Sequence, residues 1–268
     1  MDKRKITAFS RAAKTYDENA WLQREMWGEL FQRLKPLSLN YNHIVDIGMG
    51  TGRHTYELAV LYPDAFVVGF DIASGMVKYA ADKRSFPSNR PFVLQADLNE
   101  MPFKEESFDI AVSNVVYQSI PELFEAFLDV ERILKPKGFF CLSLLTKNTL
   151  YELHLSFERA YKNINGLIPP TIHDHPTDSA VLSALKKAGF SIVKVMRFKR
   201  RPAYKSTYEI LEWLKNIGAN HHYDNWIQGI GGRAVLKEID EIYKERYSSN
   251  GTIFATLEGL IISAKRKD

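Results

Sequence analysis

The chain has 268 residues, of which 45% are hydrophobic and 25% charged, and its formal net charge is +4 at pH 7. These values are ordinary for one large globular domain or a domain with a substantial insertion. No apolar run reaches the roughly 18 residues of a membrane span, and the single cysteine, Cys141, excludes an internal disulfide. The first ten residues lack an apolar segment, so we expect no signal peptide and a cytoplasmic location.

The first predicted element is a helix over residues 11–35. Leu22, Met26, Leu30 and Leu34 recur every four residues there, and Pro36 follows. Strands and helices then alternate along the chain. Short apolar runs predict strands at 43–48, 65–72, 91–98, 108–116 and 138–145, with helices at 55–62, 74–84 and 121–134. A further helix at 178–190 leads into a strand at 191–198, and a last strand is expected within 252–266.

The predicted strands are continuous apolar runs rather than alternating patterns. Such runs are typical of a parallel sheet that is covered by helices on both faces. We therefore predict an α/β fold with a doubly wound, mostly parallel sheet. The segments 146–180 and 202–250 are helical and aromatic, and we expect them to be insertions. Ligands of open parallel sheets bind beyond the carboxyl ends of the strands, so these insertions would cover a site there.

A glycine turn follows the strand at 43–48, in the stretch HIVDIGMGTGRHT. Gly48, Gly50 and Gly52 alternate with other residues, so the backbone can approach a ligand closely. A dinucleotide fingerprint would require a third glycine where Arg53 stands, and the Gly-Lys-Ser/Thr of a phosphate-binding loop is absent. Asp46 places a carboxylate beside the turn, which favours a cation over a phosphate.

Two further aspartates end the next two strands. Asp71 is placed to accept hydrogen bonds from the hydroxyls of a ribose, and Asp97 from the amino group of an adenine. Together with Asp46 they indicate a nucleoside with a positively charged tail that lacks phosphate. S-adenosylmethionine, which carries a sulfonium and an ammonium, fits this description.

The stretches VDIGMGTG, FDIA, ADLNEMPF and FDIAVSN together resemble class I S-adenosylmethionine-dependent methyltransferases, from about Tyr41 to Leu145. The resemblance implies a seven-stranded, mostly parallel Rossmann-like sheet with helical insertions over the active site. It also implies a cofactor site for S-adenosylmethionine. The expected cofactor-binding residues are Tyr16, Asp46, Gly48, Gly50, Gly52, Asp71, Ile72, Ala96, Asp97, Leu98 and Asn114.

The segment from Ala8 to Leu30 resembles the opening of the malonyl-acyl-carrier-protein O-methyltransferases of biotin synthesis. The matching residues are Phe9, Ser10, Arg11, Ala12, Ala13, Tyr16, Asp17, Ala20, Gln23 and Arg24. TKNTLYEL and LKNIGANH resemble two later segments of that family. Two stretches depart from it: Tyr117-Gln118-Ser119 replaces Leu-Gln-Trp, and Thr256-Leu257-Glu258 replaces Thr-Tyr-Glu. We expect an N-terminal helical lid at 1–40 and a methyltransferase domain at 41–268. Because Tyr16 lies on a polar or mixed face of the lid, our hypothesis is that it donates a hydrogen bond to the cofactor carboxylate.

The activity that this resemblance implies is methylation of the free carboxylate of malonyl-acyl-carrier protein. Such an acceptor is already an anion at neutral pH, so no catalytic base is expected. Two alternatives stay open: a methyltransferase for another small molecule, such as a quinone precursor, and a scaffold that binds S-adenosylmethionine without catalysis. Nucleic acid is not an expected partner, because SNVVYQS lacks the Asn/Asp-Pro-Pro-Tyr/Phe motif of base methyltransferases.

The residue that would hold the acceptor carboxylate is not identified by the sequence. Arg159 and Arg197 are candidates, although a surface role suits each of them better. The segment 194–205 has six basic residues and no acid, and it is a candidate landing surface for an acidic carrier protein. The histidines at 173, 175, 221 and 222 are interpreted as loop residues, and no metal site is expected.

Overall fold

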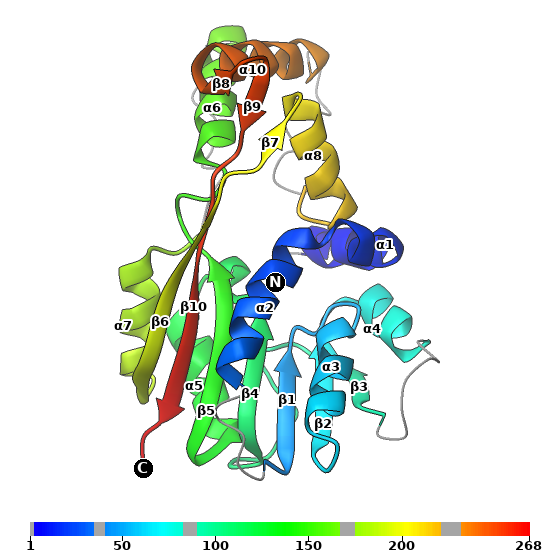
Figure 1. The fold of residues 1–268 in the computed structure, drawn as a ribbon, viewed down its shortest axis with the longest axis vertical. Helices are drawn as coiled ribbons and strands as arrows, with labels where there is room; N and C mark the ends of the chain where they lie inside the picture. The colour runs from blue at the N-terminus through cyan, green and yellow to red at the C-terminus, as the bar shows by residue number, and fades with distance from the viewer. Residues whose placement is uncertain (1–2, 35–40, 83–89, 167–174, 221–231) are drawn as a thin grey trace.

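Seven strands form the central sheet, in the order β3-β2-β1-β4-β5-β10-β6 (Figure 1). The structure is a computed structural model that describes residues 3–34, 41–82, 90–166, 175–220 and 232–268. The strands are β1 (His43–Ile47), β2 (Phe66–Asp71), β3 (Phe92–Gln95), β4 (Phe108–Asn114), β5 (Leu134–Leu145), β6 (Phe190–Arg200) and β10 (Leu257–Arg266).

Strands β3, β2, β1, β4 and β5 pair in parallel, and β10 runs antiparallel between β5 and β6. The prediction of a mostly parallel seven-stranded sheet is therefore confirmed. Because β1 to β4 run in one direction, their carboxyl ends meet at one edge of the sheet. The glycine turn and the aspartates at the ends of β1, β2 and β3 are thereby brought together.

Helices cover both faces of the sheet, as the apolar strands require. On one face of the sheet, buried side chains of α2 (Trp21–Leu34) and α3 (Arg53–Leu61) form a hydrophobic cluster with residues of β1, β4 and β5. Those of α5 (Leu123–Ile133) and α7 (Asp178–Lys187) share a second cluster with the opposite face. Helix α4 (Ser74–Ala81) packs against β2 and β3. Cys141 is fully buried in the core.

The single N-terminal helix predicted over 11–35 is wrong, because the structure has two helices, α1 (Lys3–Asn19) and α2, separated at Ala20. The period of four belongs to α2 alone, whose Leu22, Met26 and Leu30 are buried on the sheet. Contacts that are distant in sequence hold the end of α1. The indole of Trp213 donates a hydrogen bond to the Asn19 carbonyl, and the Thr15 hydroxyl donates one to the carbonyl of Asn216.

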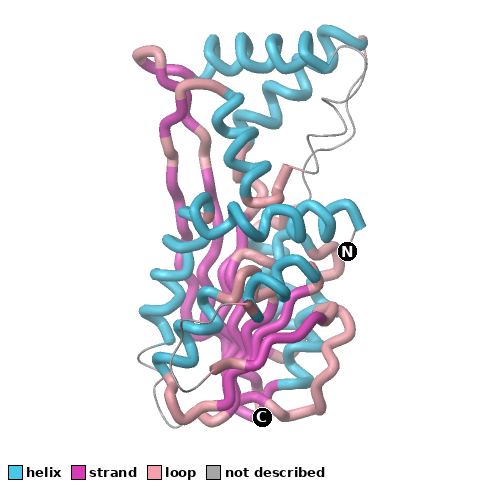
Figure 2. Tube along the Cα trace, turned by 90° about the vertical axis from the view of Figure 1, so that its right-hand side faces the viewer, coloured by secondary structure: helices cyan, strands magenta, loops and turns pink. Residues whose placement is uncertain are grey.

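The predicted insertions gather beyond the carboxyl end of the sheet, in the upper part of Figure 1. They contain α6 (Tyr151–Asn165), α8 (Thr207–Asn216) and α10 (Gly232–Tyr247), together with β7 (Ala203–Tyr204) and β8 (Ser248–Ser249). The two short strands pair with β9 (Thr252–Phe254) in a second, antiparallel sheet that the sequence did not reveal. The turned view in Figure 2 separates this upper layer from the central sheet.

Helix α1 lies between the sheet and this upper layer, and it packs against α4 and α8 (Figure 1). Helix α2, by contrast, packs against β4, β5 and β10. The approach of α1 to α4 is close, since the Gly75 amide donates a hydrogen bond to the Ser10 hydroxyl over 3.3 Å. A Cβ at Gly75 would lie 2.8 Å from the Cα of Ser10, which leaves no room for a side chain.

Substitution of Gly75 by alanine is therefore expected to push α1 away from α4 and to lower the free energy of unfolding. Overpacking of this kind costs about 1–3 kcal/mol. Gly28→Ala is the matched control, because Gly28 lies on the exposed face of α2 with no atom within 4 Å of its added Cβ. The control should gain about 0.5–1 kcal/mol from helix propensity. Urea unfolding that shows equal gains for both variants would contradict the close docking of α1.

Candidate active site

The glycine turn after β1 is held by hydrogen bonds to β2. The amides of Gly48 and Met49 both donate to the carbonyl of Phe70 over 2.9 Å. The Gly50 amide donates to the Asp71 carboxylate, also over 2.9 Å. The second oxygen of that carboxylate accepts from the Ala73 amide at 2.8 Å. Asp71 therefore fixes the turn and the start of α4 at the same time.

The three glycines of the turn have positive φ angles of 71°, 55° and 76°, which favour glycine, but their surroundings differ. A Cβ at Gly48 would lie 2.9 Å from a methyl of Val116, so packing requires glycine there. The nearest atom to a Cβ at Gly50 would be Cε1 of Tyr16, at 4.0 Å. Gly50 therefore keeps a space open between the turn and α1, which is the position for a ligand.

A cavity of about 720 Å³ opens beside Gly50 and Asp71. Its walls are mostly apolar, and the carboxylate of Asp97 lies at one end. One oxygen of Asp97 accepts from the amide and the side chain of Asn99, which orients the carboxyl group. The lining residues are Phe9, Tyr16, Gly48, Gly50, Phe70, Asp71, Ile72, Met76, Ala96, Asp97, Leu98, Asn114, Val115, Val116, Gln118, Ser119 and Ile120. We call it the nucleoside cavity.

A smaller and more polar cavity, of about 440 Å³, lies on the other side of Gly50. We call it the polar cavity. Asp46 is one of its walls and is only 2% exposed. The Thr55 hydroxyl donates to this carboxylate over 2.6 Å, but burial dominates and raises the pKa of Asp46 to about 7. Asp17, Arg24 and Arg53 also line the cavity, so charges of both signs face it.

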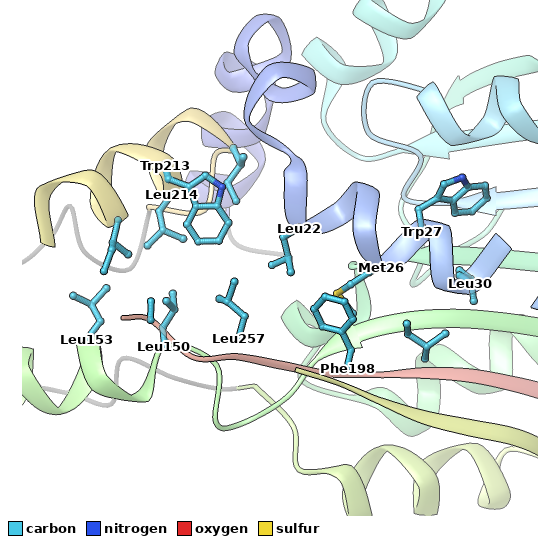
Figure 3. Packing of buried hydrophobic residues seen from close by; sticks show 14 of the residues in the cluster. Leu22, Met26, Trp27, Leu30, Leu150, Leu153, Phe198, Trp213, Leu214 and Leu257 are labelled. Atoms are coloured by element: carbon cyan, nitrogen blue, oxygen red, sulfur yellow. The ribbon is translucent and has the colours of Figure 1, made fainter. Parts of the chain in front are cut away.

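A third cavity, of about 750 Å³, lies below the upper layer. We call it the apolar cavity. Figure 3 shows five of its lining residues, which come together from α2, the residue before α6, α8 and β10: Leu22, Leu150, Trp213, Leu214 and Leu257. The remaining lining residues are Phe9, Tyr16, Gln23, Val115, Gln118, Ser119, Leu145, Thr149, His175, Ile217 and Ala219.

Tyr16 lines all three cavities. Burial raises the pKa of its hydroxyl well above the ordinary value, and the carboxylates of Asp71 and Asp17 raise it further. A hydrogen bond with the Gln23 side chain acts in the opposite direction. The hydroxyl of Tyr16 is therefore protonated near neutral pH and can donate a hydrogen bond at the junction of the three cavities.

The structure brings together ten of the eleven residues that the sequence predicted for the cofactor. Asp46 faces the polar cavity, and the other nine face the nucleoside cavity. Gly52 faces neither. It precedes α3, and a Cβ there would lie 2.8 Å from the Cβ of Ala80, so its role is packing.

Several lining residues were missed by the sequence analysis as site residues. Gln118 and Ser119 belong to the short 3-10 helix Tyr117–Ser119, which follows β4. Both residues face the nucleoside cavity and the apolar cavity. Gln23 and Arg24 belong to the matched N-terminal segment, so that segment carried a usable signal. Arg159 is exposed on α6, and Arg197 pairs with Asp178 at 2.9 Å. Neither arginine lines the apolar cavity.

The basic segment 194–205 carries less free charge than its sequence indicates. Lys199 pairs with Glu258 and Arg200 with Glu25, both at 2.7 Å. Arg201 lies 4.0 Å from the buried carboxylate of Glu152, and Arg197 is paired as described above. Of the six cations, Lys194 and Lys205 are exposed, and their side chains form no salt bridge with another described residue. These two therefore carry what remains of the positive surface.

The histidines at 173, 221 and 222 lie outside the described residues, and His175 lines the apolar cavity. Within the described ranges, no three His, Cys, Asp or Glu side chains gather as a metal site would require. None of the described helices combines the length and the apolar character needed to cross a bilayer.

Comparison with known proteins agrees with this geometry. A family model described as a methyltransferase domain matches residues 45–142, which contain the glycine turn and both predicted nucleoside aspartates. The YcgJ protein of Bacillus subtilis has a similar fold, with a TM-score of 0.58 and 17% identity over 89% of this chain and 98% of that one. The fold and the family match thus define a methyltransferase domain on a Rossmann-like sheet.

Two relatives extend the similarity beyond the central domain. A malonyl-[acyl-carrier protein] O-methyltransferase of Methylovorus is 31% identical over 96% of this chain and 87% of its own length. Another, from Gallionella capsiferriformans, is 32% identical over 94% of this chain and 86% of its own. The chain belongs to the malonyl-[acyl-carrier protein] O-methyltransferase family.

The segments that carried the family resemblance contact one another in the structure. A Cβ at Gly218, in LKNIGANH, would lie 2.9 Å from the Cα of Phe9 in the N-terminal segment. Glu152, in TKNTLYEL, is fully buried and accepts hydrogen bonds from the amide and the hydroxyl of Thr256. These contacts lie around the apolar cavity, so they define its shape.

The pKa of Asp46 predicts a pH dependence. Because the folded-state pKa is raised from 3.8 to about 7, the folded protein holds this proton more tightly than the unfolded chain. Ionisation of Asp46 therefore destabilises the folded protein, and the free energy of unfolding should fall as the pH rises from about 4 to 7. Asp46→Asn should remove this part of the pH dependence in thermal unfolding.

A cationic ligand in the polar cavity favours the ionised form of Asp46, so its binding is expected to release protons near pH 7. Calorimetry in two buffers with different ionisation enthalpies measures this release directly. Heats of S-adenosylmethionine binding that are independent of the buffer in the wild-type protein would contradict the assignment. The assignment would also be contradicted if Asp46→Asn released as many protons as the wild-type protein.

Proposed function

We propose that this protein transfers a methyl group from S-adenosylmethionine to the free carboxylate of malonyl-acyl-carrier protein, a step of biotin synthesis. The near full-length similarity to relatives with that name supports the proposal. The apolar cavity is the single structural observation that carries it. This cavity is bounded by the upper layer, adjoins the cofactor region at Tyr16, and is lined mainly by apolar side chains, as small-molecule sites usually are.

The residues of the two smaller sites fit the methyl donor. We propose that Asp71 accepts the ribose hydroxyls and that the free oxygen of Asp97 accepts the adenine amino group, between the apolar walls of the nucleoside cavity. Asp46 would face the ammonium in the polar cavity. The carboxylate of the donor would be held by Tyr16 and by the nearby arginines Arg24 and Arg53. The open space at Gly50, which a Cβ would partly fill, is consistent with a ligand that lies across the turn.

S-adenosylmethionine supplies an electrophilic methyl carbon when it is bound. The protein has to align the acceptor carboxylate with that carbon and to exclude water. Alignment alone can contribute about 7–11 kcal/mol to lowering a barrier of this kind. The acceptor is an anion at neutral pH, so the mechanism requires no general base. The lining of the apolar cavity is consistent with this, since it holds no carboxylate among the described residues.

A methyltransferase for another small acceptor, such as a quinone precursor, would also use an apolar cavity. No specific feature of this cavity favours that alternative, and both relatives reported above have the malonyl-carrier name.

The carrier protein has two candidate docking surfaces. One is the basic segment 194–205, where Lys194 and Lys205 are exposed. The other is helix α1, which has the exposed cations Arg11 and Lys14 and also contributes Phe9 to the apolar cavity. We propose that α1 is the surface used, because it borders the cavity that the acyl arm must enter. An acidic carrier would be steered to it by charge.

Replacement of Tyr16 by phenylalanine is expected to weaken binding of S-adenosylhomocysteine about tenfold, because a hydrogen bond to a charged group is lost. Calorimetry gives the dissociation constant. Tyr62→Phe is the control, because the Tyr62 hydroxyl donates to the Leu34 carbonyl outside the site. A dissociation constant that Tyr16→Phe leaves unchanged would refute the proposed lid contact.

The acceptor is tested with labelled S-adenosylmethionine and either malonyl-acyl-carrier protein or malonyl-coenzyme A. We expect methylation of the carrier-bound form, with a higher kcat/KM than for malonyl-coenzyme A. The double variant Arg11→Glu/Lys14→Glu should lower kcat/KM for the carrier at low salt about tenfold and leave that for malonyl-coenzyme A nearly unchanged. Lys194→Glu/Lys205→Glu is the matched comparison.

No methylation of either malonyl thioester would overturn the proposed function. Loss of carrier-dependent activity in the 194/205 variant, with full activity in the 11/14 variant, would move the docking surface to the basic segment.

A further inference from the structure

The apolar cavity offers no fixed positive charge to an anionic acceptor. Among its described lining residues there is no lysine and no arginine, and only Tyr16 and His175 can ionise. The stretches 167–174 and 221–231, which adjoin His175 and Ala219 in the chain, contain no lysine or arginine in their sequences. A carboxylate that enters this cavity would normally require a cation, because an unpaired buried charge is costly.

Of the two neighbouring cavities, only the polar cavity presents cations, and these are the arginines that we propose for the donor carboxylate. The nucleoside cavity presents the carboxylates of Asp71 and Asp97. In the polar cavity, Arg24 donates to the Asp17 carbonyl, and Arg53 pairs with Glu57 at 3.3 Å. Neither arginine is part of the lining of the apolar cavity. Once the donor carboxylate occupies Arg24 and Arg53, the described residues leave no lysine or arginine for the acceptor carboxylate.

Two buried amide oxygens make the acceptor side still less favourable for an anion. Gln23 is 7% exposed and lines the apolar cavity, and its side-chain oxygen has no hydrogen-bond partner in the described structure. The side-chain oxygen of Gln118 is likewise buried without a partner, while its amide nitrogen donates to the Val115 carbonyl over 2.9 Å. Unpaired carbonyl oxygens repel a carboxylate and attract a positive group. They lie in walls that the apolar cavity shares with the polar and nucleoside cavities.

We propose that the acceptor pocket, whose described lining holds no lysine or arginine, uses the positive charge of the bound methyl donor as the counter-charge of the acceptor carboxylate. This inference rests on the proposed function and extends it to the order of binding. The acceptor is held well only when the cofactor site contains a cation. After transfer, both reacting groups are uncharged and the acceptor site loses its affinity.

The chemistry gives a reason for such a pocket. A carboxylate oxygen bonds to the methyl carbon, the bond between carbon and sulfur breaks with its electron pair left on sulfur, and a neutral ester and a neutral thioether result. Opposite charges therefore disappear along the reaction. A fixed lysine or arginine would stabilise the reactant carboxylate more than the transition state, and would slow the step. A neutral lining avoids that penalty, and low polarity strengthens the attraction between the reacting charges.

The test compares the affinity of malonyl-acyl-carrier protein for two complexes of the full-length enzyme. One complex is saturated with sinefungin, whose amine places a positive charge where the sulfonium would be, and the other with the neutral S-adenosylhomocysteine. We expect at least tenfold tighter binding to the sinefungin complex, which corresponds to about 1.4 kcal/mol. The measurement is made at pH 8.5, where an ordinary histidine is neutral.

The methyl ester of malonyl-acyl-carrier protein is the control ligand, because it keeps the carrier and the arm but lacks the charge. It should bind both complexes equally. Equal affinity of the malonyl form for the two complexes overturns the inference, as does an equal preference of the ester for sinefungin. If the wild-type enzyme methylates the malonyl carrier, such a result leaves the proposed function standing. If it does not, the function and the inference fall together.

A variant supplies the missing charge directly. Ser119→Lys should raise the affinity of the malonyl carrier for the S-adenosylhomocysteine complex at least tenfold and should lower kcat, whereas Ser119→Met adds similar bulk without charge and should not raise that affinity. His175→Gln should keep the preference for the sinefungin complex. An equal gain with Ser119→Met, or loss of the preference in His175→Gln, contradicts a pocket without its own cation.

Discussion

The hydrogen bond from the Gly50 amide to the Asp71 carboxylate is the constraint on which the rest of the site depends. It joins the ends of β1 and β2 at the edge where the parallel strands terminate, and it fixes a turn whose central residue has no side chain. The same carboxylate anchors the start of α4 through Ala73. A bare backbone and a row of strand-end acids thus face the same space, which suits a cationic nucleoside better than a phosphate.

The second element of the account is the way in which distant segments cover this edge. Helix α1 is held by α4 on one side and by α8 on the other, through Gly75 and through Trp213. Tyr16 is thereby placed over Gly50, where the three cavities meet. One side of this tyrosine is polar and charged, and the other is apolar and formed largely by the upper layer. Under the proposed function, this division would separate the binding of the donor from the selection of the acceptor.

The sequence predicted the parts of this arrangement that are local. Continuous apolar runs predicted the sheet, and the glycine turn, the strand ends and the N-terminal segment predicted ten of the residues that line the nucleoside and polar cavities. The prediction of one N-terminal helix failed because the break at Ala20 depends on contacts with α8, about 195 residues away. The sequence could not predict the apolar cavity for the same reason. Its lining residues, among them Phe9, Ser119, Thr149 and Leu257, come together only through the tertiary fold. The basic segment seemed more charged than it is, because its acidic partners Glu25, Glu152, Asp178 and Glu258 lie elsewhere in the chain.

The site itself is tested most directly by titration calorimetry of S-adenosylhomocysteine into the wild-type protein and into Asp71→Ala, with ATP and NAD as comparison ligands. The account predicts saturable binding of S-adenosylhomocysteine at one site, at least tenfold weaker in the variant, and no comparable heat from either phosphate-bearing ligand. Unchanged affinity in Asp71→Ala, or tighter binding of ATP or NAD, would contradict it.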